Sequence, residues 1–339
     1  LSCSLSDSRL LAQQAEPKLW YGKQRTIHYK PEGSDFVLVN GKKRFNRALY
    51  GTNTAFRVET GDLPEFALYL PGMGGNLKFG LISGADSKWI INAAEIETRY
   101  RPGSMIYKIK DPMLGSGVLN LHVLAQADGE GILVKADFSG TPKGVELFWA
   151  FGGATGKKFS RDGDIGADPE SSFYLKPEYC SNNSFIIDKN RFLLSYGAGR
   201  VLTEAERYEI QHVPGNKEAG VAEPQKQLSG MFPLGSKLKI ADAARQESPL
   251  VLSLSAASKQ PVVTGRIGSS AAKNFYFLIQ SPNEKAELNY ALLPAKFAKA
   301  EAFRAQLANR VKVNTPDPFI NTLGGALAVG ADAIWGDPT

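Results

Sequence analysis

The sequence predicts an all-β protein in which a large antiparallel β-sandwich is followed by two helices. Short apolar segments, broken by Gly, Pro, Asn and Asp, run from Arg25 to about Gln280 with hardly any helical pattern between them. Such a series of short strands is typical of antiparallel sheets. After Pro294 the apolar residues instead recur at helical spacing, which marks a change of architecture.

About fifteen strands are expected from the apolar segments and the turn residues between them. The earlier ones are expected at Thr26–Lys30, Phe36–Val39, Ala55–Thr60, Phe66–Leu70, Leu77–Ile82, Glu95–Arg101, Met105–Lys110, Val118–Gln126, Gly131–Phe138 and Val145–Phe151. The later ones are expected at Ser184–Ile187, Arg191–Ser195, Lys237–Ile240, Leu250–Ser255 and Asn274–Gln280.

The segment Leu119–Ala125 shows most clearly how these strands are expected to pack. Its odd positions are all apolar, while Asn120 and His122 occupy the other face together with Leu124. A period of two means that one face is buried and the other is wetter, as in a sandwich of two sheets.

Two helices are expected at the C-terminal end. Ala295–Val313 carries Phe297, Ala300, Leu307 and other residues at a spacing of three to four, among good helix formers. A second helix is expected after Asp317, which suits the N-cap, and Pro318, which suits the first helical position.

This second helix combines an apolar stripe with many small residues. The stripe consists of Ile320, Leu323, Leu327, Gly330/Ala331 and Ile334. Glycine inside a helix costs about 0.5–1 kcal/mol relative to alanine. So many small residues therefore predict a close-packed neighbour, which we expect to be protein beyond residue 339.

Composition narrows the class of protein. In 339 residues, 43% are hydrophobic and 22% charged, which is enough apolar material for a sizeable core. The net charge of +6 is too mild to indicate a nucleic-acid partner. No stretch reaches the roughly 18 apolar residues of a transmembrane helix, so we expect no transmembrane segment.

The N-terminal residues leave the cellular location open between two readings. The sequence around Cys3 is compatible with the end of a lipoprotein signal, whose cysteine carries lipid, and Leu10–Ala15 with the end of an ordinary export signal. We expect a periplasmic or secreted protein, with a lipid anchor if the first reading holds. An arbitrary polar leader is the alternative.

The common catalytic and nucleotide-binding motifs do not fit. Phe151–Lys158 is the nearest segment to a phosphate-binding loop, but it lacks the first Gly and the Ser/Thr after the Lys. The three histidines, His28, His122 and His212, are dispersed and do not form a metal-ligand spacing. His122 draws attention because it lies on the polar face of a strand, where a hydrogen-bonded surface residue is the ordinary interpretation.

One acidic cluster is a candidate metal site. Asp162, Asp164 and Asp168 alternate on a glycine-bent loop, and such carboxylates can converge on Ca²⁺, which takes six to eight oxygen ligands. The EF-hand pattern fails, because Phe173 stands where its closing Glu belongs. A solvated turn in which the aspartates cap backbone N–H groups is the alternative.

Aromatic residues suited to stacking on sugars are also present. They are Trp20, Tyr21, Trp89, Trp149, Tyr174 and Tyr179, each of which has core packing as its ordinary interpretation. Many carboxylates are available, but no pair is marked by its spacing as the acid and base of a glycosidase.

Asn314–Trp335 resembles the first barrel helix of the six-hairpin glycosidases, a group that includes glucoamylase-like enzymes and maltose and kojibiose phosphorylases. Arg47–Phe56, Leu70–Gly75 and Phe159–Asp168 resemble an uncharacterised domain at the front of large, secreted, polysaccharide-related bacterial proteins. The resemblance implies a galactose-mutarotase-like β-supersandwich, a linker helix and the first helix of a truncated (α/α)₆ barrel.

The resemblance also implies a domain division and a role. A leader covers residues 1–24, the supersandwich 25–293, the linker helix 294–313 and the start of the helical barrel 314–339. In these enzymes the general acid and base lie on barrel loops, so no residue up to 339 inherits a catalytic role. We therefore expect a non-catalytic β-sandwich region of a glycoside-hydrolase-like protein, which meets carbohydrate through its parent protein.

Two other functions remain open at this stage. One is a carbohydrate-binding or assembly module that adjoins no catalytic barrel. The other is an aldose 1-epimerase-like enzyme, which needs a Glu and a His on opposite faces of the sugar ring and would use His122 or His212.

Overall fold

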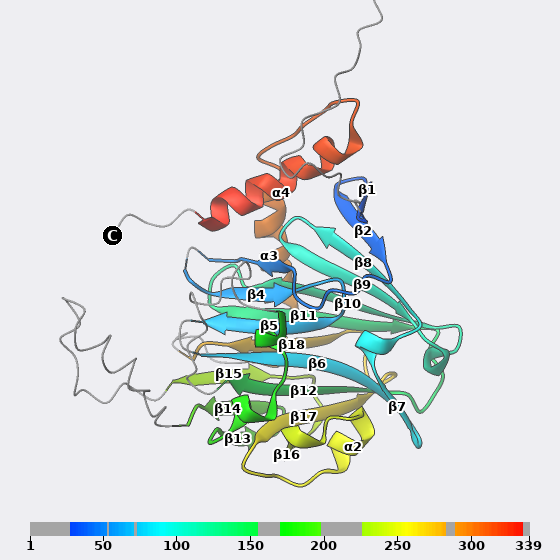
Figure 1. Cartoon of the computed structure of the whole chain (residues 1–339), viewed down its shortest axis with the longest axis vertical. Coiled ribbons are helices and arrows are strands. Elements are labelled where there is room, and N and C mark those ends of the chain that lie inside the picture. The colour runs from blue at the N-terminus through cyan, green and yellow to red at the C-terminus, as the bar shows by residue number, and fades with distance from the viewer. Residues whose placement is uncertain are drawn as a thin grey trace, which may run out of the picture.

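Two antiparallel sheets, packed face to face, make up most of the protein (Figure 1). The computed structural model describes residues 28–52, 54–70, 73–154, 170–197, 226–282 and 289–334. The expectation of a mostly β protein with antiparallel sheets and few helices is confirmed.

The larger sheet has ten strands in the order β1-β2-β8-β9-β10-β11-β18-β15-β14-β13. Their bounds are β1 Lys30–Glu32, β2 Asp35–Val39, β8 Glu95–Arg101, β9 Ser104–Lys110, β10 Val118–Ala125, β11 Gly131–Ser139, β18 Phe275–Gln280, β15 Gln227–Met231, β14 Arg191–Ser195 and β13 Ser184–Asp188.

The smaller sheet has eight strands, in the order β16-β17-β12-β6-β5-β4-β3, with β7 paired to β6. Their bounds are β16 Lys237–Asp242, β17 Pro261–Gly268, β12 Glu146–Ala154, β6 Met73–Ser83, β5 Glu65–Leu70, β4 Arg57–Thr60, β3 Arg47–Leu49 and β7 Asp86–Trp89.

The main core lies between the two sheets. The alternation predicted for Leu119–Ala125 is confirmed, because Leu119, Leu121 and Val123 are fully buried in it. Aromatic rings from the two sheets meet at its centre: Phe277 on β18 lies 5.1 Å from Phe79 on β6 and 5.0 Å from Trp149 on β12, edge to face. These contacts hold the two sheets together.

Three α-helices are described: α2 Pro249–Leu254, α3 Leu293–Ala308 and α4 Pro318–Ile334. Short 3-10 turns are η1 Ile90–Asn92, η2 Pro112–Leu114, η4 Glu170–Phe173, η5 Pro177–Cys180, η6 Ala243–Arg245 and η7 Tyr290–Leu292. The predicted cap of the last helix is confirmed, since the Phe319 N–H donates to Asp317 Oδ1 at 2.8 Å.

The expected strand at Leu250–Ser255 is wrong. The segment is helix α2, because Ser248 caps it by accepting the Val251 N–H at 3.2 Å and Pro249 occupies its first turn. Strands β3, β7, β15 and β17 had not been expected. The expected helix Ala295–Val313 also ends earlier, at Ala308, where Asn309 caps it.

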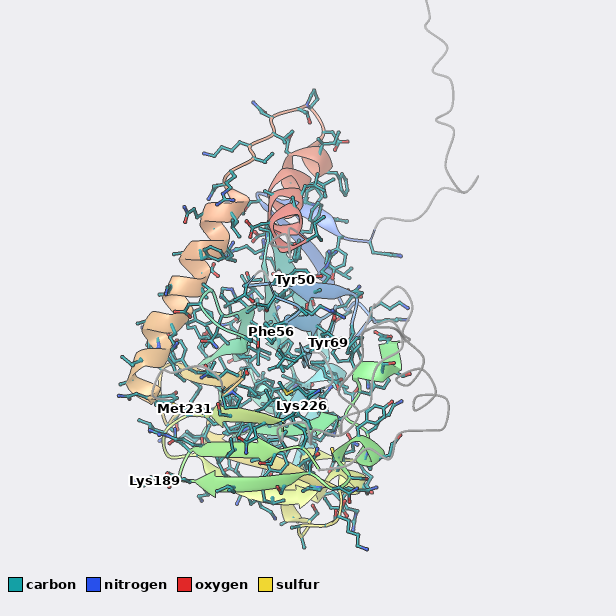
Figure 2. All side chains as sticks on the ribbon, turned by 90° about the vertical axis from the view of Figure 1, so that its left-hand side faces the viewer. Tyr50, Phe56, Tyr69, Lys189, Lys226 and Met231 are labelled. Carbon is teal, nitrogen blue, oxygen red and sulfur yellow. The ribbon has the colours of Figure 1, made fainter. Side chains whose placement is uncertain are left out.

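Helix α3 covers the outer face of the larger sheet, as Figure 2 shows along one side of the molecule. Leu124, which the sequence analysis placed on the wetter face of its strand, packs there with Leu133, Leu278 and Phe297. The expectation of a wet outer face is therefore wrong where α3 lies on β10, β11 and β18.

Candidate functional site

The outer face of the smaller sheet carries an unusual number of buried polar side chains. Strand pairing places Glu65 opposite Lys78 and Ala67 opposite Asn76, so these side chains share one face. The intervening residues Phe66 and Leu77 point into the main core. Glu65, Asn76 and Lys78 are nevertheless all buried. We call these three residues, with Arg44 and Glu170, the outer-face cluster.

Asn76 is held in one orientation. Its Nδ2 group donates to Glu65 Oε1 at 2.9 Å and to the Phe173 carbonyl at 2.8 Å. Both N–H donors are therefore used, which fixes the direction of the amide. Its Oδ1 atom is buried and has no hydrogen-bond partner among the described residues.

Each charged side chain of the outer-face cluster has a polar partner. Arg44 Nε lies 3.5 Å from Glu65 Oε2, and Lys78 Nζ donates to Gln246 Oε1 at 3.1 Å. Lys78 also lies over the Trp89 ring, 4.3 Å from its centroid. Burial lowers the pKa of Lys78, although the nearby carboxylate of Glu65 opposes this. The cluster therefore carries no large excess of either sign.

The segment Glu170–Cys180 covers this part of the sheet. Glu170 Oε1 accepts the backbone N–H groups of Arg44 and Phe45, the latter at 2.9 Å. Phe173 packs on Phe45 with ring centroids 5.6 Å apart. Arg44 stacks on Tyr174, 4.3 Å from the ring centroid.

Gly152 on β12 lets this covering segment approach the sheet. A Cβ atom at Gly152 would lie 2.5 Å from Leu175 Cδ1 and 2.8 Å from Cys180 Sγ. Both distances are shorter than real Cβ atoms show, so a side chain at this position would displace Leu175 and Cys180. Burial raises the pKa of the Cys180 thiol to about 12, so this sulfur stays protonated.

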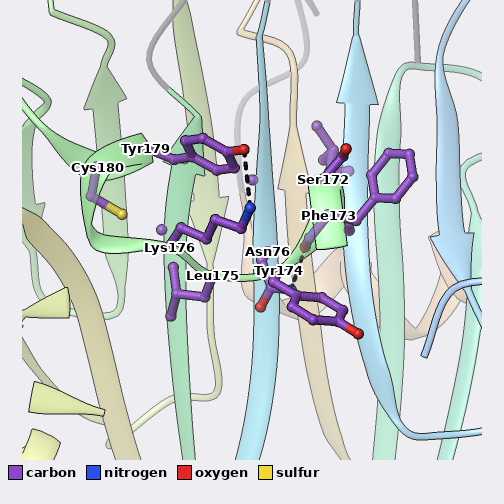
Figure 3. A pocket seen from close by; sticks show the side chains of 13 residues that line it. Asn76, Ser172, Phe173, Tyr174, Leu175, Lys176, Tyr179 and Cys180 are labelled. Carbon is purple, nitrogen blue, oxygen red and sulfur yellow. Dashed lines mark hydrogen bonds between the residues drawn. The ribbon is translucent and has the colours of Figure 1, made fainter. Parts of the chain in front are cut away.

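A pocket lies between the covering segment and the sheet (Figure 3). It measures about 290 Å³, including the part open to solvent. Asn76 and the glycines of β6 and β12 line it from the sheet, and Ser172, Tyr174, Lys176 and Tyr179 line it from the covering segment. Lys176 Nζ donates to the Tyr179 hydroxyl at 3.3 Å. The pocket therefore combines an amide oxygen with aromatic rings.

A second buried carboxyl group lies farther along the same face. Glu59 on β4 has no solvent exposure and is ion-paired with Arg57, which also stacks on Tyr69 at 4.1 Å. Burial raises the pKa of Glu59 to about 7, and the charge and hydrogen bond of Arg57 offset only part of this rise. Strongly shifted carboxyl groups cluster at functional sites but also occur in structural ion pairs.

His122 lies beneath helix α3. Its Nε2 is 3.3 Å from Glu301 Oε2, and its ring meets Phe297 edge to face at 5.0 Å. Burial lowers the pKa of His122, and Glu301 opposes the effect. Helix α3 therefore covers most of this imidazole, whose side chain is 18% exposed. His212, the other histidine considered for an epimerase, lies outside the described residues.

The candidate calcium ligands Asp162, Asp164 and Asp168 lie outside the described residues, so calcium binding stays a prediction. Within the described ranges, no group of three His, Cys, Asp or Glu side chains is placed to hold a metal ion. Strand pairing, which the sequence analysis did not assign, is what brings Asn76 and Glu65 together.

In the described part of the chain, the candidate sugar-stacking aromatics divide into two groups. Trp149 and Trp89 are core residues, as their ordinary interpretation expected. Tyr174 and Tyr179 instead line the pocket. Trp20 and Tyr21 lie outside the described residues.

Helix α4 packs on the molecule with one side only. Thr322 Oγ1 donates to the Gly33 carbonyl at 3.0 Å, and Phe319 lies 6.5 Å from Phe36, so this side faces β1 and β2. A Cβ at Gly324 would lie 2.8 Å from Val313 Cγ2, which gives that glycine a neighbour within the chain itself. The expectation that the neighbour of the small residues lies wholly beyond residue 339 is wrong for Gly324 and for Gly325, where a Cβ would lie 3.3 Å from Pro102 Cγ.

The apolar stripe of α4 is exposed. The exposed fractions are 48% for Ile320, 43% for Leu323, 61% for Leu327 and 83% for Ile334. Gly330 on the same stripe has open space where a Cβ would be. We call these four apolar residues the α4 stripe. None of the helices in the described part of the chain is both long and apolar enough to cross a bilayer.

The chain is similar to a family model and to a solved structure. None of the curated proteins matches the chain. A solved bacterial glucoamylase in complex with acarbose is similar to 87% of this chain, with 9% sequence identity and a TM-score of 0.41. The chain spans 43% of the length of that glucoamylase. The model of a domain of unknown function, DUF4450, matches residues 70–301, which is more than half of the chain. The chain therefore belongs to the DUF4450 family.

Proposed function

We propose that this chain is the non-catalytic β-sandwich region of a glycoside-hydrolase-like protein that acts on carbohydrate. In this proposal the sandwich is galactose-mutarotase-like, α3 is a linker helix and α4 is the first helix of an (α/α)₆ barrel of the six-hairpin type. The exposed α4 stripe carries the proposal, because one side of this helix is already packed and the apolar side is not.

The energetics of the α4 stripe favour a protein neighbour. Burying an aliphatic side chain fully gains about 1.5–3 kcal/mol relative to leaving it exposed. Ile320, Leu323, Leu327 and Ile334 are each at least two-fifths exposed, so a helix that covered them would gain several such contributions. A neighbouring helix of a barrel has the right shape for such a stripe.

Helix α3 provides a firm base for such an arrangement. Phe297 and Leu293 pack into the larger sheet, and Arg304 donates to the Pro102 carbonyl at 3.2 Å and to Glu301. Because α3 is fixed to the sheet and α4 is fixed to β1, the sandwich can hold a helical domain in one position.

The first experiment is to read the natural gene beyond the codon for Thr339 and to assay the whole natural protein. We expect a helical domain after Thr339 and release of sugars or sugar phosphates from at least one member of a polysaccharide panel. The double variant Leu323→Ser/Leu327→Ser should lower the unfolding temperature of the whole protein and its rate of glycan turnover.

The control is Ile186→Ser/Leu254→Ser, which removes two apolar residues from the sandwich itself that are also exposed, by 67% and 73%. In this chain alone, both double variants should change the free energy of unfolding by no more than about 0.5 kcal/mol per site. The proposal fails if no helical domain follows, if the whole protein turns over no glycan, or if the α4 variant behaves like the control.

A second candidate function is a stand-alone carbohydrate-binding or assembly module. The pocket with Tyr174 and Tyr179 favours it, since this site does not depend on a neighbouring domain. A stop codon close behind Thr339, combined with glycan binding by the chain, would favour this function over the first. Under either function we propose a periplasmic or secreted location, tested by fractionating the cells that produce the protein.

A further inference from the structure

We propose that the pocket above Asn76 binds a hydroxyl group of a neutral saccharide, which donates to Asn76 Oδ1. The choice of a saccharide rests on the proposed function, whereas the position of the site rests on the geometry alone. Figure 3 shows Asn76 on its strand beneath the segment that carries Tyr174, Lys176 and Tyr179.

Asn76 Oδ1 is the atom that points to a ligand. The residue is only 3% exposed, it lines the pocket, and this oxygen has no donor among the described residues. The amide has no freedom to turn over, because Glu65 Oε1 and the Phe173 carbonyl already accept both of its N–H groups. A buried acceptor without a donor is unfavourable, and a ligand hydroxyl group supplies the missing O–H.

Charge favours a neutral ligand. Glu65 is paired with Arg44, Glu170 accepts two backbone N–H groups, and Lys176 donates to Tyr179. Of these charged groups only Lys176 lines the pocket, where it would repel a cation and is already engaged with the Tyr179 hydroxyl. A polyhydroxylated neutral molecule offers donors without adding charge.

The aromatic residues and the size of the pocket narrow the ligand further. Tyr174 and Tyr179 give apolar ring surface for the C–H faces of a sugar, beside their polar hydroxyl groups. The enclosed part of the pocket is only about 20 Å³, which is room for about one water-sized group. The pocket therefore suits one hydroxyl group of a sugar unit at a chain end or a side branch, with the ring of that sugar resting outside against the tyrosines.

The test uses the chain with four neutral probes: cellohexaose, maltohexaose, xylohexaose and mannohexaose at millimolar concentration. Hexagalacturonate serves as the anionic comparison. The readout is the side-chain amide signal of Asn76 in a ¹H–¹⁵N spectrum, identified by its loss in Asn76→Asp. The control signal is the buried side-chain amide of Asn190, whose N–H donates to the Phe232 carbonyl far from the pocket.

We expect at least one neutral probe to shift the Asn76 signal and to leave the Asn190 signal in place. Tyr174→Ala and Ser172→Phe should each weaken binding about tenfold, by removing a ring from the rim and by filling the pocket respectively. Tyr276→Ala, at a half-buried tyrosine on the other sheet, should bind as the unaltered chain does.

Three results would overturn this inference: no neutral probe binds, only hexagalacturonate binds, or binding is unchanged in both pocket variants. These results concern the pocket alone. The proposed function fails separately, on the gene, the turnover assay and the α4 stripe, none of which involves Asn76.

Discussion

Glu59 is a carboxyl group with no solvent exposure, and it links one residue to the pH dependence of the whole fold. Its pKa in the folded protein is about 7, above the value of 4.5 that it has in an exposed chain. The folded state therefore holds a proton that the unfolded state has lost between these two pH values. Stability contributed by this group is present below about pH 4.5 and is lost as pH rises to about 7.

Glu59→Gln removes this titration while it keeps the shape of the side chain. Relative to the unaltered protein, the free energy of unfolding of the variant should rise between pH 5 and pH 8, by a few kcal/mol at most. Urea unfolding at several pH values measures this difference. Glu130→Gln, at a loop between β10 and β11, is the control. A pH-independent difference for Glu59→Gln would contradict the assignment.

Among the elements, helix α3 determines which residues on the outer face of the larger sheet are buried. Phe297 is buried between His122 and Tyr276, whereas Phe303 on the same helix is only half-buried. Phe297→Ala should lower the free energy of unfolding by about 3 kcal/mol, and Phe303→Ala by about 1 kcal/mol. Denaturant unfolding of both variants checks the values, and equal losses would mean that α3 does not dock through Phe297.

Glu301 makes the stability of α3 on the sheet depend on pH. Burial raises its pKa, but hydrogen bonds from Arg304 and His122 outweigh burial and hold the pKa well below its usual range. A carboxyl group with a depressed pKa contributes stability above its ordinary pKa of 4.5, and this contribution is lost as pH falls through the lower folded value. The docking of α3 should therefore weaken in acid, opposite in sign to the effect of Glu59.

Helix α2 was expected to be a strand because its sequence is a short apolar run. Leu250–Ser255 fits a strand and a helix equally well by composition, since six residues contain too few periods to separate the two. Ser248 and Pro249 were the distinguishing signals, because a cap and a proline at the first position mark a helix start. The C-terminal helices were easier, since each carries several turns of regular spacing.

For the whole molecule, the decisive contacts are those between the sheets. Phe277 on the larger sheet meets Phe79 and Trp149 on the smaller sheet, and also Phe232, which follows β15. Phe277→Ala should lower the free energy of unfolding by about 4 kcal/mol, because the cavity forms where the sheets are held together. Phe185→Ala, at a half-buried ring on β13, should cost clearly less. Similar losses in denaturant unfolding would contradict this view of the core.

The sequence predicted most strands, the buried face of Leu119–Ala125 and the cap at Asp317, because each depends on neighbours in the chain. It did not predict which strands pair. The direct opposition of Ala67 and Asn76 depends on strand register, and the orientation of Asn76 depends on Phe173, far along the chain. The pocket was therefore beyond local reasoning, although two of its tyrosines had been noted. The α4 stripe was recognised, but its exposure required coordinates.

The depth of the pocket depends on Gly152, which lies beneath the covering segment. The covering segment contacts Gly152 through Leu175 and Cys180, so the lack of a Cβ atom at this residue sets how closely the segment approaches the sheet. Alanine at that site would push Leu175 and Cys180 away from the sheet, and the covering segment Glu170–Cys180 with them. A methyl group in place of one hydrogen atom would therefore change the depth of the pocket, while Asn76, Tyr174 and Tyr179 keep their side chains.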